Sequence, residues 1–147
     1  MKKFKKLIIA CDGESASGKS TAAKLISRKY KLLLINSGLL YRYASNVIIK
    51  DKPKNNISFL KKKLSKISYK RIVKLNLHSE QISNHAAVLA QNKNIRKIIN
   101  NFQKKLIKKN KKICVEGRDI ASKILAKTPK YDLAFYFKCS INVASYR

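Results

Sequence analysis

The sequence is short of the residues from which several kinds of functional site are built. It has three cysteines and two histidines in 147 residues, without the CxxC pairs or His-rich spacing of a metal site. It also shows no Ser-His-Asp or Cys-His arrangement for nucleophilic catalysis. We therefore expect Cys11, Cys114 and Cys139 to be small core residues. His78 and His85 are expected on the surface or in an insert, without a catalytic role.

Long apolar runs are also missing. No segment approaches the roughly 20 consecutive apolar residues that a membrane helix needs. The basic start, residues 1–6, is followed by an apolar run at residues 7–11 that ends at Asp12. That run is too short for the apolar part of a signal peptide. A cytoplasmic protein without a membrane contact is expected.

Acidic residues are scarce, since seven Asp and Glu stand against 35 Lys and Arg, for a formal net charge of +28. Clustered positive charge of this size is typical of proteins that bind nucleic acid. Here most of it is lysine spread along the whole chain beside abundant Ile and Asn, which indicates a bias toward A- and T-rich codons. Nucleic-acid binding is therefore not expected, and a basic binding module with a vestigial phosphate loop remains the alternative.

The length and the 45% of hydrophobic residues allow one domain with a modest core. On the first expected helix, Ala22, Ala23, Leu25 and Ile26 fall close to one face, which we expect to be buried. Strands that alternate with helices predict a three-layer α/β fold with a parallel sheet. The predicted strands are residues 7–11, 32–35, 72–77, 113–115 and 133–137; the predicted helices are residues 19–30, 39–49, 57–67, 82–91 and from 94 onward, with a turn at 36–38.

Residues 13–20 read GESASGKS and match the phosphate-loop pattern GxxxxGK[ST] between a predicted strand and a predicted helix. In such a loop, backbone N–H groups point at a phosphate and the helix N-terminus adds partial positive charge. Lys19 would reach the β- and γ-phosphates, and the Ser20 hydroxyl would ligate Mg²⁺. The predicted contacts to a nucleoside triphosphate are Gly13, Glu14, Ser15, Ala16, Ser17, Gly18, Lys19, Ser20 and Thr21, of which Thr21 can instead pack or cap locally.

Three further polar clusters follow predicted strands or begin predicted helices, where an open α/β sheet collects its ligands. Each cluster contains an arginine, although only six of the 35 basic residues are arginines. A planar guanidinium grips phosphate through two hydrogen bonds, which an ammonium cannot do. Arg42, Arg96 and Arg118 therefore indicate a second phosphate site, with structural ion pairs as the alternative. The clusters are residues 36–42, 94–96 and 116–119.

Over residues 7–147 the chain resembles the bacterial cytidylate kinase family. The resemblance rests on three blocks whose order and separation match: Asp12-Gly13 with the phosphate loop, Ser37-Gly38 with Tyr41-Arg42, and Glu116-Gly117-Arg118-Asp119. The long insert at about residues 43–94 resembles the enlarged CMP-binding region of this family. The resemblance implies a nucleoside-monophosphate-kinase fold and phosphoryl transfer from ATP to CMP or dCMP with Mg²⁺.

The resemblance also assigns roles to individual residues. Lys19 would be catalytic beside two residues of the acceptor site, and Glu116 would order Mg²⁺ through water. Because in-line transfer between two bound nucleotides depends on positioning and charge neutralisation, no covalent nucleophile is needed. The acceptor site would comprise Ser37 at the base or sugar of CMP, Arg42, Arg96 and Arg118 at its phosphate, and Asp119 at its sugar, with Arg118 and Asp119 also catalytic.

Four positions depart from the usual residues of the family: Glu14 stands for Pro, Asn36 for Asp, His78 for Arg and Ala87 for Ser. Losing a guanidinium and a hydroxyl in the acceptor region removes contacts that discriminate between bases or bind phosphate. The expected acceptor is therefore less strictly CMP. AMP, UMP or a small metabolite remain alternatives.

Family members continue past the position of Arg147 into an arginine-bearing lid, further helices and a last strand. Arg147 itself stands where a first lid arginine would be. Because a lid excludes water and brings charge to the transferred phosphate, we expect residues 1–147 to form a single, incomplete domain. Alone it would be a monomer that binds ATP weakly and shows little kinase activity, unless a second chain supplies the lid.

Overall fold

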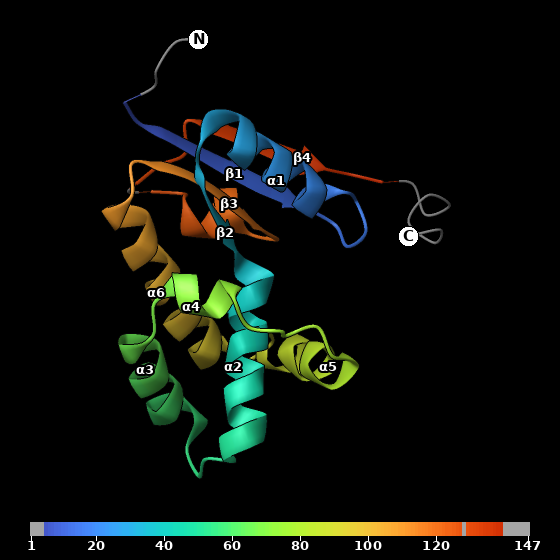
Figure 1. Cartoon of the computed structure of the whole chain (residues 1–147), viewed down its shortest axis with the longest axis vertical. Helices are drawn as coiled ribbons and strands as arrows, with labels where there is room; N and C mark the ends of the chain where they lie inside the picture. Colours follow the sequence, from blue (N-terminus) through green and yellow to red (C-terminus); the bar gives the residue numbers. More distant parts are fainter. Residues whose placement is uncertain (1–4, 128, 140–147) are drawn as a thin grey trace. The chain divides into compact units, whose positions relative to one another are not determined.

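The computed structural model describes residues 5–127 and 129–139, and the chain divides into two compact units. The sheet unit takes its described residues from 1–36 and 103–147, and the helical unit comprises residues 37–102 (Figure 1). The insert expected at residues 43–94 lies within the helical unit. Arg147, the expected lid arginine, lies outside the described residues.

The sheet unit is built on a four-stranded parallel sheet with the strand order β2-β3-β1-β4. Residues of β1 are buried at all seven positions, as expected for a strand covered on both faces. Helix α1, Lys19–Tyr30, has the predicted bounds. The α/β class and the parallel sheet are confirmed. The strands are β1 Leu7–Gly13, β2 Leu33–Asn36, β3 Lys112–Gly117 and β4 Leu133–Phe137.

The register of the sheet brings the polar ends of three strands to one edge. Glu116 on β3 lies opposite Asn36 on β2 and opposite Cys11 on β1. One position further along, Asp12 pairs with Gly117. Since the strands are parallel, the phosphate loop after β1 and the polar segment after β3 leave the sheet at this same carboxyl edge.

The core on the α1 side of the sheet contains two of the three cysteines. Cys11 and Cys114 are fully buried with Ala23 of α1, and their sulfur atoms lie 3.7 Å apart. The hydrogen bond to Cys114 and the burial of the thiol raise the pKa of Cys11 above its usual value. The prediction that these two are core residues is confirmed, and Cys139 is half-buried.

The helical unit consists of helices (Figure 1), and side-chain caps mark the starts of α3 and α5. The Asn55 side chain accepts the N–H groups of Ile57 and Ser58 at 3.0 and 3.1 Å, and Ser79 accepts that of Ile82 at 3.3 Å. Among residues 5–127 and 129–139, no helix is both long and apolar enough to cross a membrane. The helices are α2 Ser37–Asp51, α3 Asn56–Lys66, α4 Tyr69–Val73, α5 Glu80–Leu89 and α6 Lys93–Lys109, the last belonging to this unit up to residue 102.

The strand predicted at residues 72–77 is wrong. Residues 69–73 form helix α4, and the rest is irregular. The prediction used the alternation of Val73, Leu75 and Leu77 with polar residues, but Val73 and Leu75 are 54% and 40% exposed. Ile72 and Leu77 are the buried pair, so the apolar pattern of this stretch does not have the period of a strand.

Two smaller predictions also need correction. No turn separates β2 from the next helix, because Asn36 is still in the strand and α2 begins at Ser37. On α1, Leu25 is 60% exposed rather than buried. The buried positions of α1 are Ala23 and Ser27, so the face that packs on the sheet is narrower than the run of apolar residues suggested.

Candidate functional site

The phosphate loop starts at a position that only glycine can occupy. Gly13 ends β1 with φ of 154°, and a Cβ atom there would overlap the carbonyl oxygen of Phe137. That same carbonyl accepts the Glu14 N–H at 3.3 Å. At the other end of the loop, Gly18 has φ of 79° and stands directly before α1. The two glycines let the backbone leave the strand, curl back and enter the helix within a few residues.

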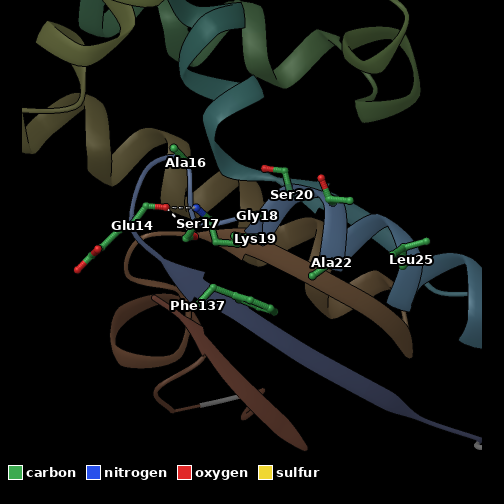
Figure 2. A pocket seen from close by; sticks show the side chains of 10 residues that line it. Glu14, Ala16, Ser17, Gly18, Lys19, Ser20, Ala22, Leu25 and Phe137 are labelled. Carbon is green, nitrogen blue, oxygen red and sulfur yellow. Dashed lines mark hydrogen bonds between the residues drawn. The ribbon is translucent and has the colours of Figure 1, made fainter. Parts of the chain in front are cut away.

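Lys19, the first residue of α1, reaches back over the loop. Its Nζ lies 3.2 Å from the carbonyl oxygen of Gly13 and 3.5 Å from that of Glu14. The Ser17 hydroxyl donates to the Glu14 carbonyl at 2.9 Å and closes the turn. Figure 2 shows the ammonium group beside these loop atoms, while the Glu14 side chain extends away from the loop. The ammonium group of Lys19 therefore lies beside the loop backbone.

A cavity of about 620 Å³ opens beside the loop (Figure 2). This volume falls in the range of small-molecule sites. The hydroxyl groups of Ser20 and Thr21 belong to exposed residues of its lining, and Leu25 and Phe137 give it an apolar side. The start of α1, a helix of 12 residues, contributes N–H groups and the positive end of its dipole. The lining consists of Glu14, Ala16, Ser17, Gly18, Lys19, Ser20, Thr21, Ala22, Leu25 and Phe137.

Glu116 is a buried carboxylate at the end of β3, only 2% exposed. Its Oε1 accepts a hydrogen bond from the Asn36 amide across the sheet, and its Oε2 is buried with no hydrogen-bond partner in the described part of the chain. A buried carboxylate oxygen without a donor is costly. Such an oxygen suits a water of a hydrated cation, which would supply the missing donor.

Arg118 and Asp119 follow β3 directly. Arg118 is exposed, whereas Asp119 is half-buried and forms an ion pair with Lys123 at 2.8 Å. They precede η1, a short π-helical turn at Ile120–Ile124. The two residues therefore stand at the carboxyl edge of the sheet to which the phosphate loop also belongs.

The remaining predicted acceptor residues lie in the helical unit. Ser37 is buried and is the first residue of α2, and Arg42 is half-buried further along the same helix. Arg96 is half-buried in the first turn of α6. Its backbone N–H donates to the carbonyl oxygen of Asn92 at 2.9 Å. The predicted site thus divides between the units: the loop and residues 116–119 in one, Ser37, Arg42 and Arg96 in the other.

Sequence reasoning gave no structural role to Asp12, Phe137 or Lys123. The side chain of Asp12 accepts two backbone N–H groups from the start of η1, Phe137 touches the loop from β4, and Lys123 pairs with Asp119. Only Asp12 carried a signal in the sequence, as an acidic residue that directly follows an apolar strand. The contacts of Phe137 and Lys123 depend on the tertiary arrangement and left no local pattern.

The protein has few groups of its own to hold a metal ion. Among the described residues no cluster of three His, Cys, Asp or Glu side chains could hold a metal. Mg²⁺ usually binds through one or two protein oxygens, waters and substrate phosphates. The Ser20 hydroxyl and the unpartnered Oε2 of Glu116 fit that mode.

Comparisons with known proteins agree with the family resemblance found in the sequence. A family model described as "Cytidylate kinase" matches residues 9–147. The cytidylate kinase of Mesomycoplasma hyopneumoniae strain 7448 is 34% identical over 146 aligned positions, covering 90% of this chain and 62% of the relative. That of Aquifex aeolicus strain VF5 is 35% identical over 133 positions, covering 82% and 60%. That of Ureaplasma urealyticum serovar 10 is 35% identical over 160 positions, covering 100% and 69%.

The chain spans about three fifths of the length of the first of these relatives, and the match to the family model runs over nearly all of its own residues. The expected resemblance is therefore confirmed. With a phosphate loop, a parallel sheet and the polar segment after β3 in the order of that family, the chain belongs to the cytidylate kinase family.

Proposed function

We propose that the protein transfers the γ-phosphoryl group of ATP to CMP or dCMP, giving ADP and CDP or dCDP. The observation that carries the proposal is the shared carboxyl edge of the sheet, where the phosphate loop follows β1 and Arg118 and Asp119 follow β3. A nucleotide kinase needs two sets of phosphates held close together with their charge neutralised. In a chain of the cytidylate kinase family, these two segments are suited to the donor and the acceptor.

The donor ATP would bind in the cavity beside the loop. Its phosphates would accept hydrogen bonds from the loop N–H groups, and its β- and γ-phosphates would draw the Lys19 ammonium away from the carbonyls of Gly13 and Glu14. At 3.2 and 3.5 Å those contacts are long for an ammonium donor. Exchanging them for phosphate oxygens is favourable, because an anion attracts the ammonium more strongly than a neutral carbonyl does.

The acceptor CMP would use the arginines and Asp119. Asp119 would bind the sugar, and Arg118 would hold the phosphate. Arg42 and Arg96 remain candidates from the sequence for binding the same phosphate. The pair between Asp119 and Lys123 is largely exposed, with side chains 40% and 56% accessible. Exposed ion pairs contribute at most about 1 kcal/mol, so opening this one to admit a sugar hydroxyl costs little.

Mg²⁺ would be held by the Ser20 hydroxyl and by the ATP phosphates, with a bound water donating to Glu116 Oε2. When bound, the ion neutralises part of the charge on the transferred phosphate. The hydrogen bond from Asn36 to Oε1 holds the Glu116 carboxylate in place. The chain's own part is therefore to present one oriented, buried oxygen to the hydrated ion.

Binding is the direct test, and it is measured by calorimetric titration of residues 1–147 with ATP and separately with CMP, dCMP, UMP and AMP. We expect ATP to bind with Mg²⁺, and CMP and dCMP to bind at least about tenfold more tightly than AMP, a difference of about 1.4 kcal/mol. Arg118→Lys is the matched variant for the acceptor, because it keeps the charge and removes the planar fork.

Two outcomes would contradict the proposal. Equal affinity for CMP and AMP would favour another small nucleotide kinase, with its acceptor named by the panel. Salt-dependent RNA binding that survives Lys19→Ala, without nucleotide binding, would favour a basic nucleic-acid module instead. A selective loss of CMP affinity in Arg118→Lys, with ATP affinity unchanged, would support the assignment of Arg118.

A further inference from the structure

Asp12 is an acidic side chain buried at the end of β1, 7% exposed, directly before Gly13 of the phosphate loop. An ionised carboxylate in such a position is costly unless hydrogen bonds replace its water. Both oxygens have backbone donors. Oδ1 accepts the N–H of Ile120 at 2.7 Å, and Oδ2 accepts the N–H of Ala121 at 2.8 Å. The carboxylate is thus satisfied by a segment 108 residues away in the sequence.

The two donors open the short helical turn η1, whose first N–H groups have no partner inside the turn. The residue in the capping position, Asp119, makes no side-chain cap hydrogen bond. Ile120 is 2% exposed, so an unsatisfied N–H there would be penalised. Asp12 therefore performs the capping role from a neighbouring strand and leaves the Asp119 side chain to face Lys123.

Asp12 also fixes the other end of the same segment. Its backbone pairs in register with Gly117, the last residue of β3. Only Arg118 and Asp119 stand between this pairing and the two N–H groups held by the carboxylate. One residue thus anchors the two-residue segment on both sides, and the same residue is bonded covalently to Gly13 of the loop.

We infer that Asp12 is a positioning residue that fixes Arg118 and Asp119 relative to the phosphate loop. Through it, the segment proposed to bind the acceptor is tied to the loop proposed to bind the donor. The functional meaning of the tie rests on the proposed function, whereas the hydrogen bonds themselves do not.

The test uses Asp12→Asn, which keeps the shape of the side chain but places an NH₂ donor against one of the two N–H groups. Asp132→Asn is the matched control. The Asp132 carboxylate also accepts a backbone N–H in the sheet unit, that of Ile8 at 2.7 Å, but near the opposite end of β1. Two quantities are measured on residues 1–147: the amide exchange rates of Ile120 and Ala121, and the dissociation constants for CMP and ATP.

In Asp12→Asn we expect exchange at Ile120 and Ala121 to accelerate by at least about tenfold and the CMP dissociation constant to rise by about tenfold or more. The ATP dissociation constant should change by less than about threefold, since the loop keeps its glycines and Lys19. Asp132→Asn should move neither quantity. Unchanged exchange, or equal losses for ATP and CMP, would overturn the inference.

A second variant protects the test against a folding defect. Ala121→Pro removes one of the two donors and leaves Asp12 intact, and proline is tolerated in the first turn of a helix. It should raise the amide exchange rate of Ile120 and weaken CMP binding, as Asp12→Asn does. If the unmodified chain does not bind CMP, the proposed function fails. In that case amide exchange alone decides the inference: wild-type rates at Ile120 in both variants, and at Ala121 in Asp12→Asn, would refute it.

Discussion

The two units of the molecule hold their polar side chains in different ways. In the sheet unit, Asp12 binds the start of η1, Asn36 binds Glu116 and Asp132 binds Ile8, and these partners are 108, 80 and 124 residues apart in the sequence. In the helical unit, the Ser45 hydroxyl joins α2 to Ile82 and His85 of α5, but many of the other side-chain hydrogen bonds are caps. Asn55 and Ser79 bind N–H groups two or three residues further along the chain.

This difference separates two uses of a polar residue. A cap satisfies a helix end wherever the helix lies, so it specifies secondary structure and says little about tertiary arrangement. A hydrogen bond between strands and loops far apart in the sequence fixes those segments relative to each other. Two of the segments fixed in this way, those that follow β1 and β3, are ones that we expect to carry phosphate. Equivalent substitutions in the two units should therefore differ in both size and kind of effect.

The largest contrast is expected between two glycines. Gly13→Ala should destabilise the protein by more than about 3 kcal/mol and abolish ATP binding, because a Cβ atom would overlap the Phe137 carbonyl and the backbone would have to move. Gly38→Ala, in the first turn of α2, should instead stabilise by up to about 1 kcal/mol. Urea unfolding of both variants measures the contrast, and similar effects of the two would remove it.

The next contrast is between two lysines. Lys19→Ala should weaken ATP binding by about 10- to 100-fold, because the loop loses the mobile charge for the β- and γ-phosphates. Lys63→Ala, in the helical unit, removes a lysine that forms an exposed ion pair with Asp51 at 2.7 Å. It should change ATP affinity by less than about twofold. Titration with ATP decides, and a weak effect of Lys19→Ala would show that the loop does not bind the triphosphate.

Asn36→Ala tests a long-range hydrogen bond in the sheet unit. It should cost about 2 kcal/mol of unfolding free energy at neutral pH, because Glu116 stays buried and loses the donor to its Oε1. Asn76→Ala, at an exposed loop position of the helical unit, should cost less than about 0.5 kcal/mol. Chemical denaturation provides the measurement. Equal small losses would mean that the bond between Asn36 and Glu116 contributes nothing to stability.

The smallest effect is expected at a cap of the helical unit. Asn55→Ala should cost about 1 kcal/mol, because the N–H groups of Ile57 and Ser58 lose their acceptor. ATP affinity should not change beyond the effect on folding. Lys54→Ala, at the exposed neighbouring position, is the control for substitution near the cap. A change in ATP affinity, measured where the variant is fully folded, would show that α3 influences the donor site.

The sequence predicted the elements whose signals are local. Strand β1, helix α1 and the phosphate loop between them were placed by a continuous apolar run, a helical period and two glycines, and the structure has them with almost the same bounds. The strand predicted at residues 72–77 failed because five alternating residues do not distinguish a strand from a short helix followed by a loop. Burial failed on Leu25 for a similar reason, since periodicity does not say how wide the covered face is.

The sequence proposed residues for the site but gave no account of how they are anchored. The motifs identified Lys19, Arg118 and Asp119 as candidates and left their spatial roles as predictions. The tie from Asp12 to Ile120 depends on strand register and on the path of the chain after β3, neither of which leaves a short-range pattern. An acidic residue at the end of an apolar strand is the one sequence signal that could have pointed to this tie.

The most direct test of the central claim uses a compound in which adenosine and cytidine are joined through a chain of phosphates. If the protein holds donor and acceptor phosphates together, this compound should bind at least about tenfold more tightly than ATP, because the second contact becomes intramolecular. The gain should be lost in Arg118→Lys, and most binding should be lost in Lys19→Ala. An affinity equal to that of ATP, unaffected by Arg118→Lys, would contradict the account.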